Sequence, residues 1–197
     1  MNKPWTVTKL FIGLCKKPNS PKLYWPLLFI MSPDRKEAKK RWLATEVGGR
    51  VVKEKLNLVE TLKNLSDEKK GSVAEYYKAF CIYWEVDTSI YFNGVKTPTK
   101  PEDYILQRSI VSHDLSHVIL NYDASIKGEM QLMMYQFSQT KNWGFFLFAM
   151  AMAWRFISSP YLLIKAYNRG KRTLDLRFLD WETILGMDMK EIRRMFT

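Results

Sequence analysis

The sequence is poor in cysteine and in long apolar runs, and both absences exclude classes of protein. Only two cysteines, Cys15 and Cys81, occur in 197 residues, which excludes a disulfide-stapled fold and predicts two buried thiols in a reducing compartment. No apolar run approaches the roughly 20 residues that a membrane-spanning helix needs, and the N-terminus lacks the layout of a signal peptide. We therefore expect a cytoplasmic protein in which residues 1–197 form a single domain.

Acidic residues are outnumbered by basic ones, and the formal net charge is +11. That charge favours an anionic partner, although a soluble protein with a lysine-rich surface has the same balance. The basic residues are spread over several segments without a nucleic-acid motif, which argues against nucleic acid. We expect residues 35–41 and 165–172 to attract an anionic membrane surface and the apolar residues beside Pro160 to insert shallowly. This pattern predicts peripheral association with the inner membrane.

Helical spacing dominates the periodic stretches of the chain. The first expected helix begins at Pro33, with Ser32 as its N-cap. Further helices are expected over about 52–65, 73–84, 102–120, 124–139, 143–157, 160–168 and 184–196. A turn is predicted at 121–123, and Gly170 with Lys171-Arg172 is predicted to stop a helix. The segment 87–101 breaks the pattern, and a brief strand pair around 91–92 stays open there. The sequence therefore predicts an all-α, single-domain helical bundle.

Histidine is as scarce as cysteine, and both histidines fall in one five-residue window, His113-Asp114-Leu115-Ser116-His117. Two randomly placed histidines lie four apart in roughly 1 of 100 cases, and four is the spacing of two metal ligands on one helix face. At about 100° per residue, His113, Asp114 and His117 lie within an arc of about 100°. Glu129 comes twelve residues after His117, in a second helical pattern that can fold back against the first.

These residues have the chemistry of a divalent-metal site. Imidazole nitrogens suit zinc, iron and cobalt, and carboxylates neutralise a dication, so we expect zinc first, with iron, cobalt, manganese and magnesium as alternatives. Asp114 either binds the metal or orients an imidazole. The competing interpretation is that both histidines are ordinary core or surface residues. A metal site requires the ring nitrogens and the Glu129 carboxyl group to converge within about 5 Å of one point.

A longer set of residues around this motif carries a resemblance. It comprises Tyr104, Gln107-Arg108, the HDxxH window, Gly128-Glu129, Gln139-Thr140, Gly170-Lys171-Arg172, Trp181-Glu182 and Glu191-Ile192-Arg193. In these positions the chain resembles the coenzyme Q (ubiquinone) biosynthesis protein 4 family, whose signature is HDxxH, eleven residues and then glutamate. The similarity is strongest over 103–140 and 166–194, and one departure is Asn121, where the family often has glycine.

The resemblance implies an all-α fold in which His113, Asp114, His117 and Glu129 are the metal ligands and the catalytic residues. It implies a role in ubiquinone biosynthesis at a membrane surface, beside other quinone-biosynthesis proteins, and it leaves a homodimer open. One view of the family is a metal-dependent enzyme that removes the C1 carboxyl group of a polyprenylated hydroxybenzoate while hydroxylating that carbon. The other is a prenyl-lipid-binding scaffold with a structural metal. An open coordination position favours the enzyme, and a closed four-ligand site favours the scaffold.

The apolar stretch 143–168 and the methionines before it indicate where a polyprenyl tail could bind. The candidates for lining a lipid tunnel are Met130, Met133, Met134, Phe137 and Met150. Methionine adapts to irregular apolar ligands, although each of these residues also suits an ordinary core. Arg108 is a candidate for holding a carboxylate or phosphate head group, or for a salt bridge to an acid that orients a ligand.

Overall fold

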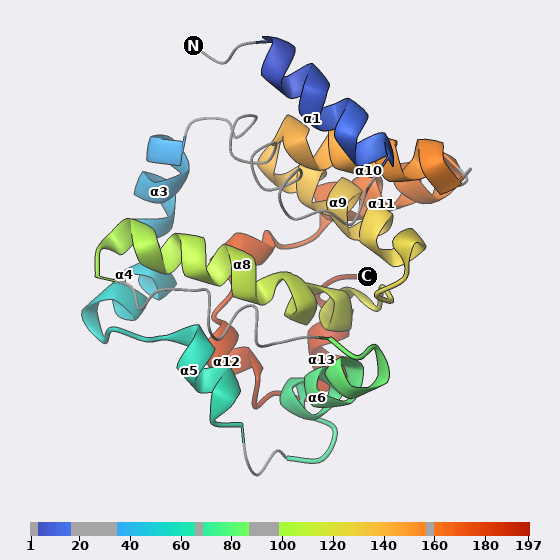
Figure 1. Cartoon of the computed structure of the whole chain (residues 1–197). Helices are drawn as coiled ribbons and strands as arrows, with labels where there is room; N and C mark the ends of the chain where they lie inside the picture. The colour runs from blue at the N-terminus through green and yellow to red at the C-terminus, as the bar shows by residue number, and fades with distance from the viewer. Residues whose placement is uncertain (1–3, 17–34, 66–68, 87–98, 157–159) are drawn as a thin grey trace. The chain divides into compact units, whose positions relative to one another are not determined.

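The structure, a computed structural model, describes residues 4–16, 35–65, 69–86, 99–156 and 160–197 (Figure 1). These residues form helices, so the all-α fold class is confirmed, and the one β pairing among them is an isolated bridge between Ser72 and Asp188. The helices are α1 (Pro4–Lys16), α3 (Arg35–Leu43), α4 (Glu46–Lys53), α5 (Leu58–Lys63), α6 (Val73–Tyr83), α8 (Pro101–Leu120), α9 (Ile126–Thr140), α10 (Trp143–Phe156), α11 (Pro160–Arg172), η1 (Leu176–Phe178), α12 (Trp181–Ile184) and α13 (Met189–Arg194). The strand pair considered at 91–92 lies outside the described residues.

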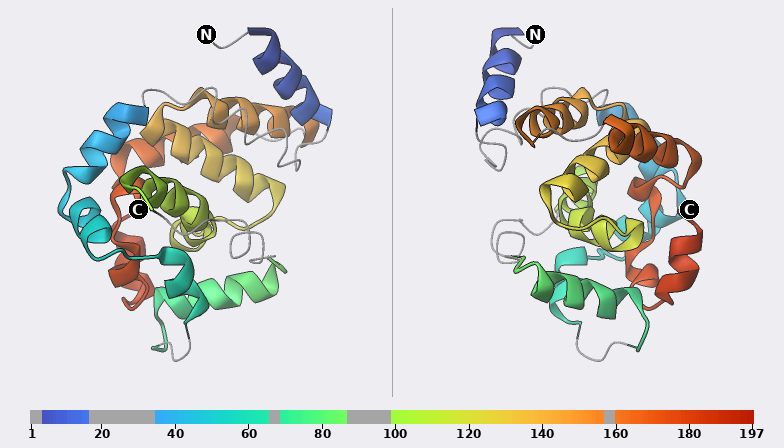
Figure 2. Two further views of the ribbon diagram at one scale, coloured as in Figure 1. Left: turned by 60° about the vertical axis from the view of Figure 1, so that its left-hand side comes forward. Right: turned by 90° about the vertical axis from the view of Figure 1, so that its right-hand side faces the viewer.

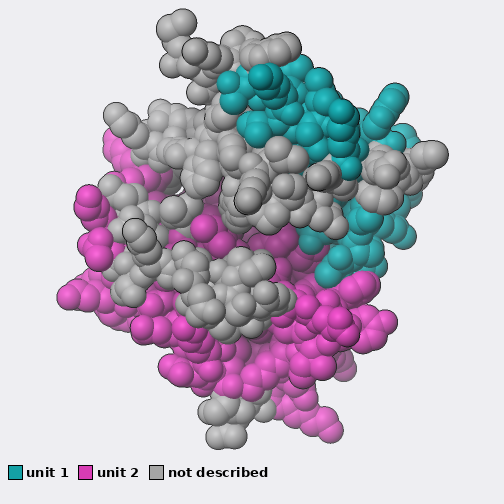
Figure 3. Space-filling view, in the orientation of Figure 1, with its two compact units in different colours: residues 1–35, 122–173 teal, residues 36–121, 174–197 magenta. Residues whose placement is uncertain are grey.

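The chain divides into two compact units, which Figure 3 shows in different colours. Unit 1 comprises residues 1–35 and 122–173, and unit 2 comprises residues 36–121 and 174–197. Each unit therefore combines two separate stretches of the chain. The expectation of a single domain over 1–197 stays a prediction.

Unit 1 is built around α9, which packs against both α10 and α11, while α1 packs on α10 (Figure 2). Gly170 allows the close approach of α11 to α9. A Cβ atom at Gly170 would lie 2.1 Å from Ser138 Oγ and 2.7 Å from the Tyr135 carbonyl oxygen. The helix stop predicted at Gly170-Lys171-Arg172 falls at the last of these residues, since α11 ends at Arg172. Gly170 itself lies inside the helix and serves packing.

Unit 2 is built around the 20-residue helix α8, against which α4, α5, α6, α13 and η1 pack. Leu115 and Ile119 of α8 are fully buried. The helix is also tied by polar contacts, since Gln107 Nε2 donates to Asn57 Oδ1 at 2.8 Å. Helix α8 is therefore held by neighbours from both stretches of the unit.

Two predicted helices are broken where the sequence suggested continuity. The stretch 52–65 is interrupted after α4, because Lys55 adopts a φ of 55° and Asn57 caps a new helix, α5. The stretch 184–196 is interrupted because Asp188 caps α13 through the backbone N–H groups of residues 190 and 191. The turn predicted after α8 is confirmed, with Asn121 at a φ of 56°, a conformation that asparagine tolerates better than most residues.

Candidate metal centre

The two histidines share one face of α8, as their spacing predicts. The ring centroids of His113 and His117 lie 4.9 Å apart with the rings at 88°, and His117 is only 1% exposed. Phe80 of α6 stacks on the His117 ring at 5.7 Å and 21°. Both imidazoles are thus on the same side of the helix, and an aromatic neighbour limits rotation of the inner one.

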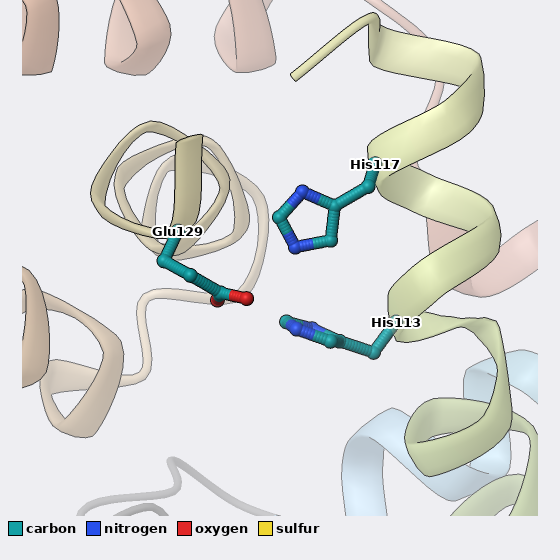
Figure 4. Close-up of side chains that lie close together, drawn as sticks. All are labelled: His113, His117 and Glu129. Carbon is teal, nitrogen blue, oxygen red and sulfur yellow. The ribbon is translucent and has the colours of Figure 1, made fainter. Parts of the chain in front are cut away.

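Glu129 lies in the first turn of α9. Ser125 caps this helix by accepting a hydrogen bond from the Gly128 N–H group, and the positive end of the helix dipole favours an ionised carboxylate here. His113, His117 and Glu129 each offer one ligand atom, and these atoms lie within 4.8 Å of one another. Figure 4 shows the Glu129 carboxyl group and the two imidazole rings directed toward each other.

This donor set fits a divalent metal chemically. Two imidazoles and one carboxylate are ligands that zinc and other first-row divalent metals accept, and catalytic zinc sites use three protein ligands of this kind with a further position for water or substrate. Two ligand atoms bound to one ion at about 2.0–2.2 Å lie at most about 4.4 Å apart. Ligand atoms within 4.8 Å of one another therefore need only small side-chain shifts to bind one ion. The group could therefore hold a metal.

Asp114 is not in this three-residue group. Its side chain is buried, at 6% exposure, and its negative charge acts on Cys81 of α6. Burial raises the pKa of Cys81 to about 11, with Asp114 adding to the rise and a hydrogen bond to Tyr77 opposing it. The expectation of two buried thiols is wrong in degree, since Cys15 and Cys81 are both half-buried. Asp114 as a metal ligand stays a prediction.

Comparisons with known proteins identify the family of the chain. The family model described as Coenzyme Q (ubiquinone) biosynthesis protein Coq4 matches residues 33–197. The chain belongs to this family. Its fold is similar to the crystal structure of a protein from Nostoc punctiforme PCC 73102, named as a candidate ubiquinone biosynthesis protein, with a TM-score of 0.66, 15% identity, and 100% of this chain and 99% of that chain covered. No curated protein matches the sequence.

Arg108 forms an ion pair within unit 2 of this Coq4-family chain. Its guanidinium group donates to both carboxyl oxygens of Glu182, at 2.6 and 2.7 Å, and to the Leu179 carbonyl oxygen at 3.4 Å. Arg108 is 4% exposed. The salt-bridge alternative is therefore present in the structure, and the head-group role stays a prediction. The sequence showed Glu182 in a family motif, but its pairing across 74 residues required the fold.

The candidate tail-binding residues of α9 and α10 differ in environment. Met130, Met133 and Met134 are buried in unit 1, whereas Met150 is 37% exposed. Phe137 is half-buried in a ring cluster with Trp143, Phe146 and Tyr167, at centroid distances of 5.1–5.8 Å. The apolar residues of this set thus range from fully buried to exposed, and their contact with a lipid stays a prediction.

The exposed surface of α10 and α11 carries large apolar side chains. Trp154 is 81% exposed, Tyr161 67% and Ile164 58%, and the exposed Lys165 lies beside them in sequence. Among the described residues, no helix is both long enough and apolar enough to cross a membrane. The side chains of residues 35–38 and the segment 157–159 lie outside the described residues, so part of the predicted membrane-binding surface lies outside them too.

Proposed function

We propose that this Coq4-family chain is a metal-dependent enzyme that removes the C1 carboxyl group of a polyprenylated hydroxybenzoate and hydroxylates that carbon. The observation that carries the proposal is the group of two imidazoles and a carboxylate with ligand atoms within 4.8 Å. The family model supports a role in ubiquinone biosynthesis. Dioxygen is the oxidant in this proposal, and one balanced form is aryl-CO2H + O2 + H2O giving aryl-OH + CO2 + H2O2.

The residues of the chain have distinct roles in this scheme. His113 and His117 would hold a divalent metal from α8, and Glu129 would hold it from α9 while neutralising part of its charge. A bound metal would supply Lewis acidity to the carboxylate or a ring oxygen of the substrate. Phe80 stacks on His117 and would limit rotation of that imidazole. Such fixed orientation is what positioning a substrate requires.

The prenyl tail would bind against apolar side chains of unit 1. Met130, Met133 and Met134 offer flexible apolar surface in the same helix as Glu129. The exposed aromatic residues Trp154 and Tyr161, together with nearby basic residues of α11, support a reversible contact with an anionic membrane. We propose that the substrate enters from such a surface and that other quinone-biosynthesis proteins work beside this one.

Reconstitution tests this proposal. The protein is stripped with a chelator, reloaded separately with zinc, iron(II), cobalt, manganese or magnesium, and given a hydroxybenzoate with a short prenyl tail under air. We expect CO2 release and a hydroxylated product only after reloading with at least one metal. His117→Ala and Glu129→Gln should each lower the rate by at least about 10²-fold, as loss of a metal ligand or its support does. Glu191→Gln, at an exposed acid of α13, is the matched control and should keep full activity.

A scaffold with a structural metal is the second candidate, and the near-complete burial of His117 favours it. A scaffold would bind one metal per chain and lose melting temperature when the metal is removed, yet release no CO2 with any metal. An active enzyme that folds equally well without metal would exclude it. Measuring CO2 release and melting temperature on the same metal-loaded and metal-free samples therefore distinguishes the enzyme from the scaffold.

A further inference from the structure

Gln136 of α9 has a buried side-chain oxygen that the described part of the chain leaves without a hydrogen bond. The Oε1 atom is inaccessible to solvent and has no hydrogen-bond partner among the residues that the structure describes. A buried acceptor without a donor destabilises the fold, and such groups are uncommon in native proteins. A buried, unpaired amide oxygen suggests a functional role, because a methionine or leucine would fill the same space without the cost of burying an unpaired polar atom.

Gln136 lies on the same face of α9 as Glu129. Both belong to one unbroken helix, Ile126–Thr140, and a separation of seven residues turns the helix by about 700°, which leaves the two side chains about 20° apart. They are separated by about 10 Å along the helix axis. The free acceptor therefore shares its face with the carboxylate of the candidate metal group, two turns further along.

Met133 and Thr140 lie on the same face of α9 as Glu129 and Gln136. Met133 lies between them on the same face and is 5% exposed, so the stretch joining the two polar groups is apolar. Thr140 comes next, but its hydroxyl already donates to the Gln136 carbonyl oxygen and accepts from the Asn142 N–H group. The face thus presents a carboxylate, a thioether and an uncommitted amide oxygen in that order.

We propose that Gln136 Oε1 accepts a hydrogen bond from the hydroxyl group of a bound aromatic acid, which sets the orientation of that ligand. The proposal rests on the proposed function. The ring carboxylate would lie at the Glu129 end, the ring would contact Met133, and the hydroxyl would donate to Gln136. A thioether is a favourable neighbour of an aromatic ring, and an amide oxygen accepts from a phenolic O–H group but gains nothing from an ether.

The test measures ligand affinity and thermal stability in parallel. The probes are a hydroxybenzoate with a short prenyl tail and its methyl ether, which lacks the hydroxyl donor, added to metal-loaded protein. Wild type should bind the hydroxyl form about tenfold more tightly than the ether, the factor expected for one buried hydrogen bond. Gln136→Met should bind both forms with equal affinity and should melt at the same temperature as wild type or higher.

Gln131→Met is the control, since it makes the same change on the opposite side of α9 and should keep the discrimination. A Gln136→Met protein that still prefers the hydroxyl form would overturn the inference, as would one that melts lower than wild type with discrimination intact. Binding of metal by wild type without binding of either ring would also overturn it while leaving the metal group standing. Metal binding is measured separately, with His117→Ala as the variant expected to lose it. A wild type that binds no metal would contradict the proposed function, and this result is distinct from a failure of the Gln136 inference.

Discussion

The two units hold their central helices by different means. In unit 2, α8 is fixed by charged and polar contacts to residues far away in sequence, such as Arg108 with Glu182 and Arg193 with the Val118 carbonyl oxygen at 2.9 Å. In unit 1, α9 is fixed by close packing, with Gly170 against Ser138 and a cluster of rings around Phe137. The histidine helix therefore adds a buried ion pair to its apolar packing. The glutamate helix relies on close packing together with neutral hydrogen bonds, such as Tyr135 with Thr173 and Gln139 Nε2 with the Gly170 carbonyl oxygen.

The two kinds of contact predict which substitutions each helix tolerates. Directional bonds fail when one partner is removed, because a buried charge or carbonyl is left uncompensated. Close packing fails when volume is added, because neighbours in a dense interior cannot yield. Substitutions that remove a charge should therefore destabilise unit 2, and substitutions that add volume should destabilise unit 1.

The largest effect is expected from breaking the Arg108–Glu182 pair. Arg108→Met leaves the carboxylate of Glu182, whose side chain is 12% exposed, without its partner, and should lower the free energy of unfolding by about 4 kcal/mol. The double variant with Glu182→Met should recover most of that loss, because an apolar pair can replace a buried ion pair. Urea denaturation of the three variants and wild type measures the coupling; additive losses would show that the pair does not stabilise α8.

Adding one methyl group to α11 should have the next largest effect. Gly170→Ala places a Cβ atom 2.1 Å from Ser138 Oγ and should destabilise the protein by about 2 kcal/mol through overpacking. Gly49→Ala is the control, because Gly49 is also helical and nothing lies within 4 Å of its Cβ position. That change should be neutral or stabilise by up to about 1 kcal/mol. Equal thermal melting of both variants would remove the close-packing account of unit 1.

A smaller effect is expected at the C-terminal end of α8. Arg193→Met removes the donor to the Val118 carbonyl oxygen and the contact of the guanidinium with the Tyr76 ring, at 5.4 Å, and should cost about 1–2 kcal/mol. Arg194→Met, at the exposed neighbouring position, should change little. Hydrogen exchange of the last turn of α8 should be faster in the first variant only. Unchanged exchange would mean that Arg193 does not hold this helix end.

The smallest effect concerns alkaline pH and Cys81. Burial raises the pKa of the Cys81 thiol from 9.0 to about 11 in the folded chain, so between these values the unfolded chain loses the proton and the folded chain keeps it. Stability contributed by this thiol therefore falls as pH rises from about 9 to about 11. Cys81→Ala should show a shallower loss of melting temperature over that range than wild type. Identical slopes would contradict the raised pKa.

The local part of this site was predictable and the tertiary part was not. The spacing of His113 and His117 predicted one face of a helix, and the pattern around Glu129 predicted the second helix. Whether Asp114 joins them depends on packing: its charge acts on Cys81, and it is not in the group of three ligand atoms. Gly170 followed the pattern of a helix stop, because a glycine that ends a helix and one that admits a neighbouring helix are alike in sequence. The helix breaks at Lys55 and Asp188 likewise depend on which side chains the tertiary structure places as helix caps.

Anomalous X-ray scattering from cobalt-soaked crystals tests the central claim most directly. The group of His113, His117 and Glu129 predicts one strong peak at about 2.0–2.2 Å from a nitrogen of each imidazole and from a Glu129 oxygen. The peak should be absent from crystals of Glu129→Gln and present in those of Glu191→Gln. A peak bound by other residues, or no peak in wild type with cobalt in excess, would contradict the account.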